Sequence, residues 1–333
     1  MARSRVGCAV RAFPRIHITL GDLGRATGRA FGGAGFSLDG PSLEIGVGRG
    51  TTRSSISGLG QLDLRAQENA NAIVHRFCAQ FGDPGVRLRA VSMIPQHIGL
   101  GSKTALLLAI GKAMAIASRE DRTRRELQLL SHRGGASGIG IHSFFTGGFV
   151  VDSGHPQDEI QDFMPSAAGA PADIPVLSTR GRVPSTWQIH LVLPRGRLAT
   201  GRVEKAFFRN ATPLPKSEVY KTLSAISHGI VPAFLTSDLG LLRSSLETIH
   251  RVGFKARELA AQTKEVRGAY SSLRMIGMGA VGMSSMGPLL YLICKGEDST
   301  NVREKIVQLC RQQRAGYLGV FRARNSGFQV RRG

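Results

Sequence analysis

The segment IGLGSKTA, residues 98–105, contains the residue types that bind phosphate. Its glycines let the backbone approach an anion closely. The residues that follow have helical spacing, so backbone N–H groups and the positive end of a helix would point at that anion. It is not a Walker A loop, which needs a glycine directly before its lysine. The segment predicts phosphate contacts from Gly99, Leu100, Gly101, Ser102, Lys103 and Thr104; the alternative is a tight turn capped by Ser102.

Two further clusters combine small residues with hydroxyl groups. They are RGGASGIG at residues 133–140 and GMSSMG at residues 282–287. The first also contains an arginine, whose planar guanidinium can hold phosphate through two hydrogen bonds. Three such clusters suggest one pocket for a ligand with several phosphates, although spacing alone does not show that they converge. The contacts predicted from these two clusters are Arg133, Gly134, Ser137, Gly138, Ser284 and Ser285.

The chain is strongly basic. It has 333 residues and a formal net charge of +21, and nine of its 44 basic residues are Lys, which leaves 35 Arg. A polyanionic ligand, nucleic acid and a codon bias toward Arg are three interpretations of this charge. Aromatic residues make up 6% of the chain, and no familiar nucleic-acid motif is present. We therefore expect no nucleic-acid partner.

The cysteines and the hydropathy of the chain limit where in the cell we expect the protein. The four cysteines form no CxxC pair, which argues against a zinc or redox site and fits a reducing compartment. The N-terminus lacks the apolar run of a signal peptide. The longest apolar stretch, residues 105–117, is interrupted by Lys112 and is too short to span a membrane. These features predict a cytoplasmic protein without a membrane segment.

Hydrophobic periodicity predicts strands and helices in both halves of the chain. In the first half it predicts strands at 14–21, 41–48, 86–94 and 148–152, helices at 62–81, 102–118 and 122–131, and a glycine-rich turn at 27–35. Residues 156–185 have no clear period and are interpreted as a long functional loop. In the second half it predicts strands at 187–194 and 317–324, helices at 216–234, 236–250, 255–265 and 300–314, and a glycine-rich turn that enters a strand within 279–294. The pattern indicates an α+β fold with helices on one face of a mainly antiparallel or mixed sheet.

The three clusters, in this order, resemble the galactokinase–homoserine kinase–mevalonate kinase–phosphomevalonate kinase (GHMP kinase) superfamily. The segments that carry the resemblance are FPRIHITLGDL, PQHIGLGSKTA and VGMSSMGP. The resemblance implies two α+β lobes, residues 1–185 and 186–333, with ligands in the cleft between them. It also implies a homodimer, by analogy with the superfamily.

One branch resembles the chain more closely, the β-ribofuranosylaminobenzene 5′-phosphate synthases. The segments are PRIHITLGDL, GGAGFSLDGP, RGGASGIGIHSFFTGGFVVDSGH, DFMPSAA and LVLPRG, within residues 13 to 325. The resemblance implies an enzyme that joins phosphoribosyl pyrophosphate (PRPP) to a carbon of an aromatic carboxylate, with loss of CO2 and pyrophosphate. In superfamily kinases with a catalytic Asp, that Asp would stand where this chain has Gly140. A glycine cannot act as a general base, so a small-molecule kinase is the weaker alternative.

The reaction that the resemblance implies assigns roles to residues of the motifs. A leaving pyrophosphate needs cations, N–H donors and Mg2+. The residues assigned to catalysis are Lys103, His17, Arg15 and His142; those assigned to the acceptor are Arg29, His132, His142 and His155; and those assigned to the metal are Asp152 and Asp22. Turn capping is an equal alternative for the two aspartates, and a structural role is the commoner one for the histidines.

Three positions depart from the aminobenzoate enzymes. Lys103, His132 and His142 stand where the resemblance leads us to expect other residues, and they add cationic or donor groups. Such groups suit a more acidic acceptor, as in the C-nucleoside synthases, which couple PRPP to an aminopyrazole dicarboxylate. The favoured acceptor is therefore 4-amino-1H-pyrazole-3,5-dicarboxylate, and 4-aminobenzoate is the alternative. If the three residues have no role in acceptor choice, they are neutral drift at the rim of the pocket.

Overall fold

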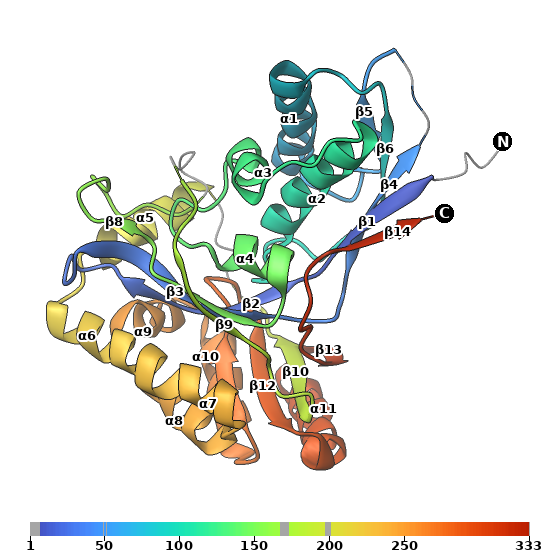
Figure 1. Cartoon of the computed structure of the whole chain (residues 1–333). Coiled ribbons are helices and arrows are strands. Elements are labelled where there is room, and N and C mark those ends of the chain that lie inside the picture. The colour runs from blue at the N-terminus through green and yellow to red at the C-terminus, as the bar shows by residue number, and fades with distance from the viewer. Residues whose placement is uncertain (1–6, 49, 51, 167–172, 197–200, 333) are drawn as a thin grey trace.

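A computed structural model describes residues 7–48, 50, 52–166, 173–196 and 201–332. Its first sheet has the strand order β14-β1-β4-β6-β5 and is antiparallel except where β5 pairs with β6. Helices α1, α2 and α3 lie together on one side of this sheet (Figure 1). The bounds are β1 Cys8–Ala12, β4 Leu43–Gly48, β5 Ser55–Ser57, β6 Arg87–Ser92, β14 Gln329–Arg332, α1 Leu64–Phe81, α2 Ser102–Ala117 and α3 Arg124–Ser131.

The second sheet links the first sheet to the helices of the C-terminal half. Its strand order is β2-β3-β7-β9, with β8 also paired to β3, and all of its pairs are antiparallel. Helix α4 packs on β2, β3 and β7. The bounds are β2 Arg15–Asp22, β3 Arg29–Ser37, β7 Phe149–Asp152, β8 His155–Pro156, β9 Leu177–Gly181 and α4 Ile139–Thr146.

The third sheet and its helices complete the molecule. The strand order is β11-β12-β10-β13, again antiparallel, and α10 and α11 pack on it. The bounds are β10 Trp187–Leu193, β11 Ala280–Met283, β12 Leu290–Lys295, β13 Gly316–Phe321, α5 Gly201–Ala211, α6 Lys216–Ser224, α7 Val231–Thr236, α8 Leu239–Ile249, α9 Gly253–Ala260, α10 Lys264–Met275 and α11 Ser299–Gln313. A π-helical segment, Ala225–Ile230, joins α6 to α7.

The predicted α+β architecture is confirmed, and so are most predicted strands and long helices. The glycine-rich turn predicted at 27–35 is wrong, because residues 29–35 belong to strand β3. A Cβ at Gly33 or Gly35 would lie 2.3 or 2.4 Å from a carbonyl oxygen of β2, so glycine lets the two strands approach closely. The helix predicted at 255–265 is also wrong in its extent, because α9 ends at Ala260 and Thr263 caps α10.

Several elements escaped the sequence prediction. Helices α4, α5 and α10 and strands β1, β9 and β14 were not predicted. Strand β14 pairs with β1 and so brings the two ends of the described chain together. The boundary between residues 185 and 186 stays a prediction; β14, which lies beyond it, belongs to the first sheet.

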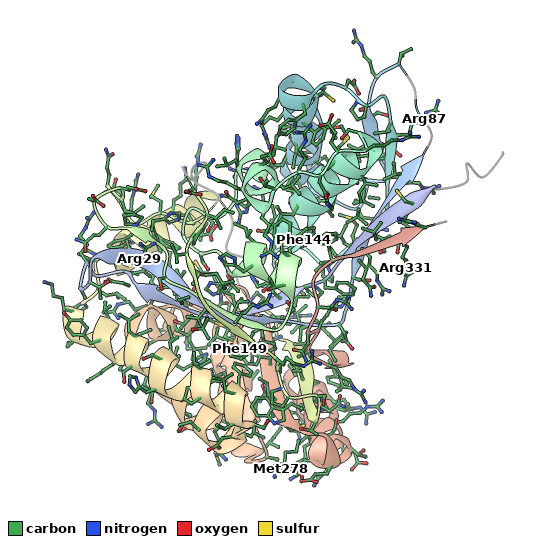
Figure 2. All side chains as sticks on the ribbon, viewed as in Figure 1. Arg29, Arg87, Phe144, Phe149, Met278 and Arg331 are labelled. Carbon is green, nitrogen blue, oxygen red and sulfur yellow. The ribbon has the colours of Figure 1, made fainter. Side chains whose placement is uncertain are left out.

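Part of the positive charge lies on the first sheet. Arg87 of β6 and Arg331 of β14 are exposed there (Figure 2). Arg331 faces Glu44 of β4, with 3.6 Å between Nη1 and Oε2. Exposed pairs of this kind contribute little to stability. In the described part of the chain, no helix is both long and apolar enough to cross a membrane.

Phe234 of α7 provides a test of the packing between the second and third sheets. Its ring stacks on Phe149 of β7, with 4.9 Å between centroids, and also contacts Phe36 and Trp187. Phe234→Ala should lower the free energy of unfolding by about 3–5 kcal/mol, because it leaves a cavity among these rings. Denaturant unfolding measures this loss. The matched control is Leu235→Ala, which removes a side chain that is 61% exposed. Equal losses for the two variants would contradict the packing described here.

Candidate active site

The segment 98–105 forms a tight loop that leads into α2. Gly99 and Gly101 have φ angles of 110° and 73°, a region that favours glycine. A Cβ at Gly99 would lie 2.4 Å from the Ser284 carbonyl oxygen, and a Cβ at Gly101 would press on the Arg15 side chain. The prediction of Ser102 as N-cap is wrong: Gly101 occupies that position and Ser102 is the first helical residue. The first N–H groups of α2 therefore stay free of a side-chain cap.

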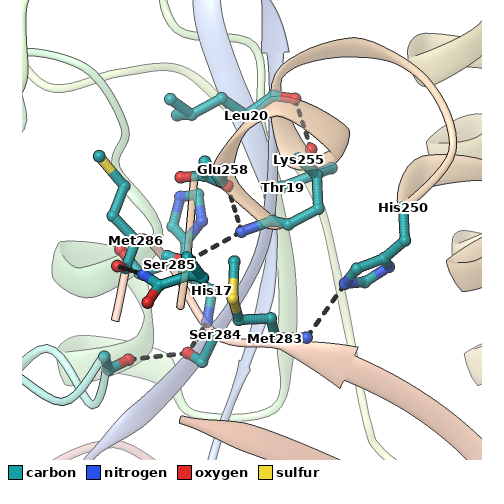
Figure 3. A network of polar contacts seen from close by, with 12 residues as sticks. His17, Thr19, Leu20, His250, Lys255, Glu258, Met283, Ser284, Ser285 and Met286 are labelled. Atoms are coloured by element: carbon teal, nitrogen blue, oxygen red, sulfur yellow. Dashed lines mark hydrogen bonds and ion pairs between the residues drawn. The ribbon is translucent and has the colours of Figure 1, made fainter. Parts of the chain in front are cut away.

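The carbonyl oxygen of Gly99 joins this loop to two other segments. Arg15 Nη1 of β2 donates to it at 2.6 Å, and Ser284 Oγ donates to it at 2.7 Å. The backbone of β2 also donates to the loop, from Arg15 N to Leu100 O. Ser284 Oγ in turn accepts from the backbone N–H of His17, and the Ser285 N–H donates to the His17 carbonyl (Figure 3). The first and third sequence clusters thus meet on β2.

The second cluster meets the same loop through Arg133. Arg133 Nε donates to Thr104 Oγ1 in the first turn of α2 at 3.1 Å, and Nη1 donates to the Ser166 carbonyl. Ser137 Oγ lies 3.3 Å from His17 Nε2. All three small-residue clusters therefore converge, which their spacing in the sequence could suggest but not show.

Two adjoining cavities lie where the clusters meet. The larger measures about 490 Å³ and the smaller about 110 Å³, and they share the lining residues Arg15, Thr104, Arg133, Glu204, Ser285 and Met286. The phosphate loop, Gly99 to Lys103, lines the larger cavity only. The smaller cavity has apolar walls as well as polar ones, including Leu20, Ile141 and Phe208. We name them the loop cavity and the inner cavity.

The lining of the two cavities is rich in positive charge. Burial, together with the charge of Arg133, lowers the pKa of Arg15 to about 10, and Arg15 Nε has no hydrogen-bond acceptor among the described residues. Burial, with the charges of Arg133 and Arg65, lowers the pKa of Lys103 to about 8. An anion that binds between such crowded, desolvated cations reduces their repulsion and replaces their lost hydration.

Two carboxylates in these walls escaped the sequence analysis. Glu204 of α5 lines both cavities, and Glu258 of α9 lines the inner cavity. Burial raises the pKa of both groups, opposed at Glu204 by Arg133 and Lys103 and at Glu258 by Lys255. Neither residue stands in a recognisable motif. Only the buried side of an amphipathic helix could have indicated them.

The two aspartates assigned to the metal have protein donors instead. Asp22 accepts hydrogen bonds from the N–H groups of Gly24, Ala26 and Thr27 and from the Thr27 hydroxyl, so it closes the turn before β3. Asp152 accepts from Ser137 Oγ, Gly138 N and Gly154 N, and burial raises its pKa to about 7. Both line a third cavity of about 420 Å³, not the two described above. Across the described residues there is no cluster of three His, Cys, Asp or Glu side chains that could hold a metal.

The residues assigned to the acceptor lie outside the described linings of the loop and inner cavities. His142 Nε2 bonds to Pro175 O and His155 Nε2 to Gly134 O, both at 2.8 Å. Arg29 donates to the carbonyls of Ser153 and Gly154 and lines the third cavity. His132 is exposed at the C-cap of α3. Of the assigned histidines, His17 alone lines the inner cavity, where burial lowers its pKa well below its usual value.

Gly140 lines the inner cavity beside Thr104. A Cβ at this position would lie 3.1 Å from Thr104 Cγ2, closer than most real Cβ contacts. The structure therefore has little room for the carboxylate that a kinase with a catalytic Asp would carry here.

Comparison with known proteins agrees with this geometry. The family model "GHMP kinases N terminal domain" matches residues 68–148. Homoserine kinase from Cytophaga hutchinsonii has a similar structure, with a TM-score of 0.69, 16% identity and 99% of each chain covered. Mevalonate diphosphate decarboxylase from Staphylococcus aureus has a TM-score of 0.63, with 12% identity and 97% of each chain covered. The chain therefore has the GHMP kinase fold.

Curated relatives narrow the class to one family. The β-ribofuranosylphenol 5′-phosphate synthase of Methanothermobacter thermautotrophicus is 34% identical over 284 residues, which cover 84% of this chain and 86% of the relative. The synthase of the same name from Archaeoglobus fulgidus is 32% identical, with 85% and 87% covered. The chain belongs to the family of β-ribofuranosylphenol 5′-phosphate synthases and is a glycosyltransferase. The names of these relatives give a phenol where the sequence resemblance gave an aminobenzene.

The pKa of Lys103 should make the affinity of the phosphate loop for anions depend on pH. Since that pKa is about 8, the ammonium is present below pH 8 and is lost as the pH rises through it. The affinity of the loop for inorganic pyrophosphate should therefore fall above about pH 8 because this cation is lost. Calorimetric titration from about pH 7 to pH 9.5 measures the profile. Lys103→Arg should move the fall to higher pH, because arginine stays charged. An unchanged profile in Lys103→Met would show that another group causes it.

Gly140 separates this site from that of a kinase. Gly140→Asp should weaken PRPP binding about tenfold or more, because its carboxylate would repel phosphate and compete for Arg133. Gly140→Ala, which adds the methyl group without the charge, is the matched control and should lose less. Fluorescence or calorimetric titration gives both affinities. ATP-dependent phosphorylation of a small alcohol by Gly140→Asp would contradict the assignment.

Proposed function

We propose that the chain joins the ribosyl 5-phosphate group of PRPP to a ring carbon of an aromatic carboxylate. The ring carbon that carries the carboxylate attacks ribose C1, and the C1–O bond breaks with its electron pair leaving on pyrophosphate. The ring–carboxylate bond then breaks, CO2 departs, and its electron pair restores aromaticity. The observation that carries the proposal is the convergence of three small-residue loops around a desolvated cluster of cations.

The loop cavity suits the pyrophosphate of PRPP. The uncapped N-terminus of α2 offers backbone N–H groups, and Lys103 and Arg133 add charge at its first turn. Donors that are already in place where negative charge develops stabilise the leaving group without reorganisation. Arg15, which reaches both cavities, completes the positive wall.

The phosphate contacts predicted in the cluster at 133–140 are partly occupied by other groups. Ser137 Oγ and Gly138 N donate to Asp152, while the Gly134 carbonyl accepts from His155. These bonds hold the 133–138 loop in shape. Arg133 is the member of that loop whose guanidinium lines both cavities, so we assign it to phosphate and the rest of the loop to its support.

The inner cavity suits a flat ring with a carboxylate. Leu20, Ile141 and Phe208 provide apolar walls, and Arg15 and Arg133 lie on the side of the loop cavity. Such a site holds the ring at C1 by orientation more than by acid–base chemistry. Gly140 has no side chain that could act as the base of an Asp-dependent kinase, and it packs tightly against Thr104.

The walls of the loop cavity offer Mg2+ a better site than the two predicted aspartates do. Glu204 and Ser102 place a carboxylate and a hydroxyl beside the phosphate loop, and Mg2+ prefers few protein oxygens together with substrate phosphates. Bound there, the ion would neutralise part of the pyrophosphate charge. Asp22 and Asp152 fit poorly, because protein N–H and hydroxyl groups occupy their oxygens.

A benzenoid acceptor fits these observations best. The relatives' name contains a phenol, which corresponds to a hydroxybenzoate acceptor once CO2 is lost. 4-Aminobenzoate has the same shape. The preference for a pyrazole dicarboxylate rested on positive charge from Lys103, His132 and His142. His132 lies outside the described linings, and burial lowers the pKa of His142, which leaves only Lys103 for that role.

The test is incubation with Mg2+, PRPP and one acceptor at a time, followed by mass spectrometry and assay of pyrophosphate. The acceptors are 4-hydroxybenzoate, 4-aminobenzoate and 4-amino-1H-pyrazole-3,5-dicarboxylate. We expect a ribosyl phosphate adduct that lacks one carboxylate, formed from a benzenoid acceptor. An adduct from the pyrazole alone would instead support a function in C-nucleoside synthesis. Pyrophosphate release from none of them, with ATP turnover instead, would overturn the proposal.

A further inference from the structure

Helix α9 places a buried ion pair against the inner cavity. Lys255 and Glu258, three residues apart, are 1% and 5% exposed, and 2.5 Å separates Nζ from Oε2. Helix α9 packs on β2, which carries Arg15 and His17. Figure 3 shows Lys255 between Glu258 and the Ser285 carbonyl, to which Nζ donates at 3.1 Å.

Such a pair is a costly way to fill a protein interior. Well-packed apolar residues of similar volume are often as stable or more so, because two charges lose their hydration on burial. Lys255 is satisfied by Glu258 and the Ser285 carbonyl. Glu258 is less so: its Oε2 is paired with Lys255 Nζ by charge, but among the described residues this buried oxygen accepts no hydrogen bond of regular geometry. Glu258 is one of the residues that line the inner cavity.

The two acidic residues of the cavity walls have different cations beside them, although the charge of Glu258 also raises the pKa of Glu204. Glu204 lines both cavities and interacts with Arg133 and Lys103, the cations of the phosphate loop. Glu258 lines the inner cavity only and interacts with Lys255. With pyrophosphate at the loop and the ring in the inner cavity, ribose C1 lies between them. Glu258 is then the carboxylate on the far side of C1 from the leaving group.

We propose that Glu258 is a catalytic carboxylate that faces the ribose and stabilises the positive charge on C1 as pyrophosphate leaves, with Lys255 positioning it. The inference rests on the proposed function. Glu258 forms no covalent bond: the C1–O bond breaks, its electron pair leaves with pyrophosphate, and the ring carbon supplies the new pair. A fixed charge in a desolvated site acts strongly on such a transition state.

The test separates this role from simple neutralisation of Lys255. Glu258→Gln removes the negative charge but leaves the buried ammonium unpaired, which itself destabilises the fold. The double variant Lys255→Met with Glu258→Gln removes both charges and leaves no buried ion. Lys255→Met alone keeps the carboxyl group but removes the cation that opposes the rise in its pKa. Thermal unfolding of each variant reports folding, and single-turnover pyrophosphate release with PRPP and the accepted aromatic carboxylate reports the chemical step.

We expect the release rate to fall about 100-fold in both Glu258→Gln and the double variant, the scale on which loss of one electrostatic group acts. The PRPP concentration at half-saturation should change by less than about threefold, because Glu258 does not face the phosphates. The release rate of the Lys255→Met variant should fall by less. A double variant that is folded and as fast as the wild type would overturn the inference and leave the proposed function intact. A wild type that releases no pyrophosphate with any acceptor would instead overturn the proposed function, and this inference with it.

Discussion

The carbonyl oxygen of Gly99 is the point on which the site depends. Arg15 and Ser284, separated from each other by most of the chain, both donate to it. Because Gly99 and Gly101 have left-handed backbone conformations, the loop can turn sharply enough to bring this carbonyl to β2 and still start α2 immediately afterwards. The same two bonds that close the loop also fix Arg15 and the 284–285 turn around the cavities.

This arrangement brings together cations that repel one another. Arg15 and Arg133 interact unfavourably, and Lys103 lies near Arg133 and Arg65. The protein supplies Glu204 and Glu258 as partial compensation within the cavity walls. A buried cluster with this balance is best stabilised by a ligand with several negative charges, and PRPP has both a pyrophosphate and a phosphate. The charges of the cavity walls thus support PRPP as the proposed substrate.

Local signals in the sequence identified the loops but not the walls. The glycine spacing at 99–101 and the cluster at 133–140 marked backbone conformations and phosphate chemistry, and both lie at the cavities. Glu204 and Glu258 could not be found in this way, since a carboxylate on a helix has no local signature until the helix is packed. Similarly, His142 and His155 looked like ligand-binding residues but hold the backbone at Pro175 and Gly134. The glycines of β3 were misinterpreted as a turn. They are glycines because β3 lies very close to β2, and this packing between strands has no signature in the local sequence.

The most direct test of this account is a calorimetric comparison of PRPP and ATP as ligands in the presence of Mg2+. We predict that PRPP binds at least about tenfold more tightly than ATP, since the cations at the loop are matched to the pyrophosphate of PRPP and no kinase carboxylate is present at Gly140. ATP that binds as tightly as PRPP, or that is hydrolysed during the titration, would contradict it.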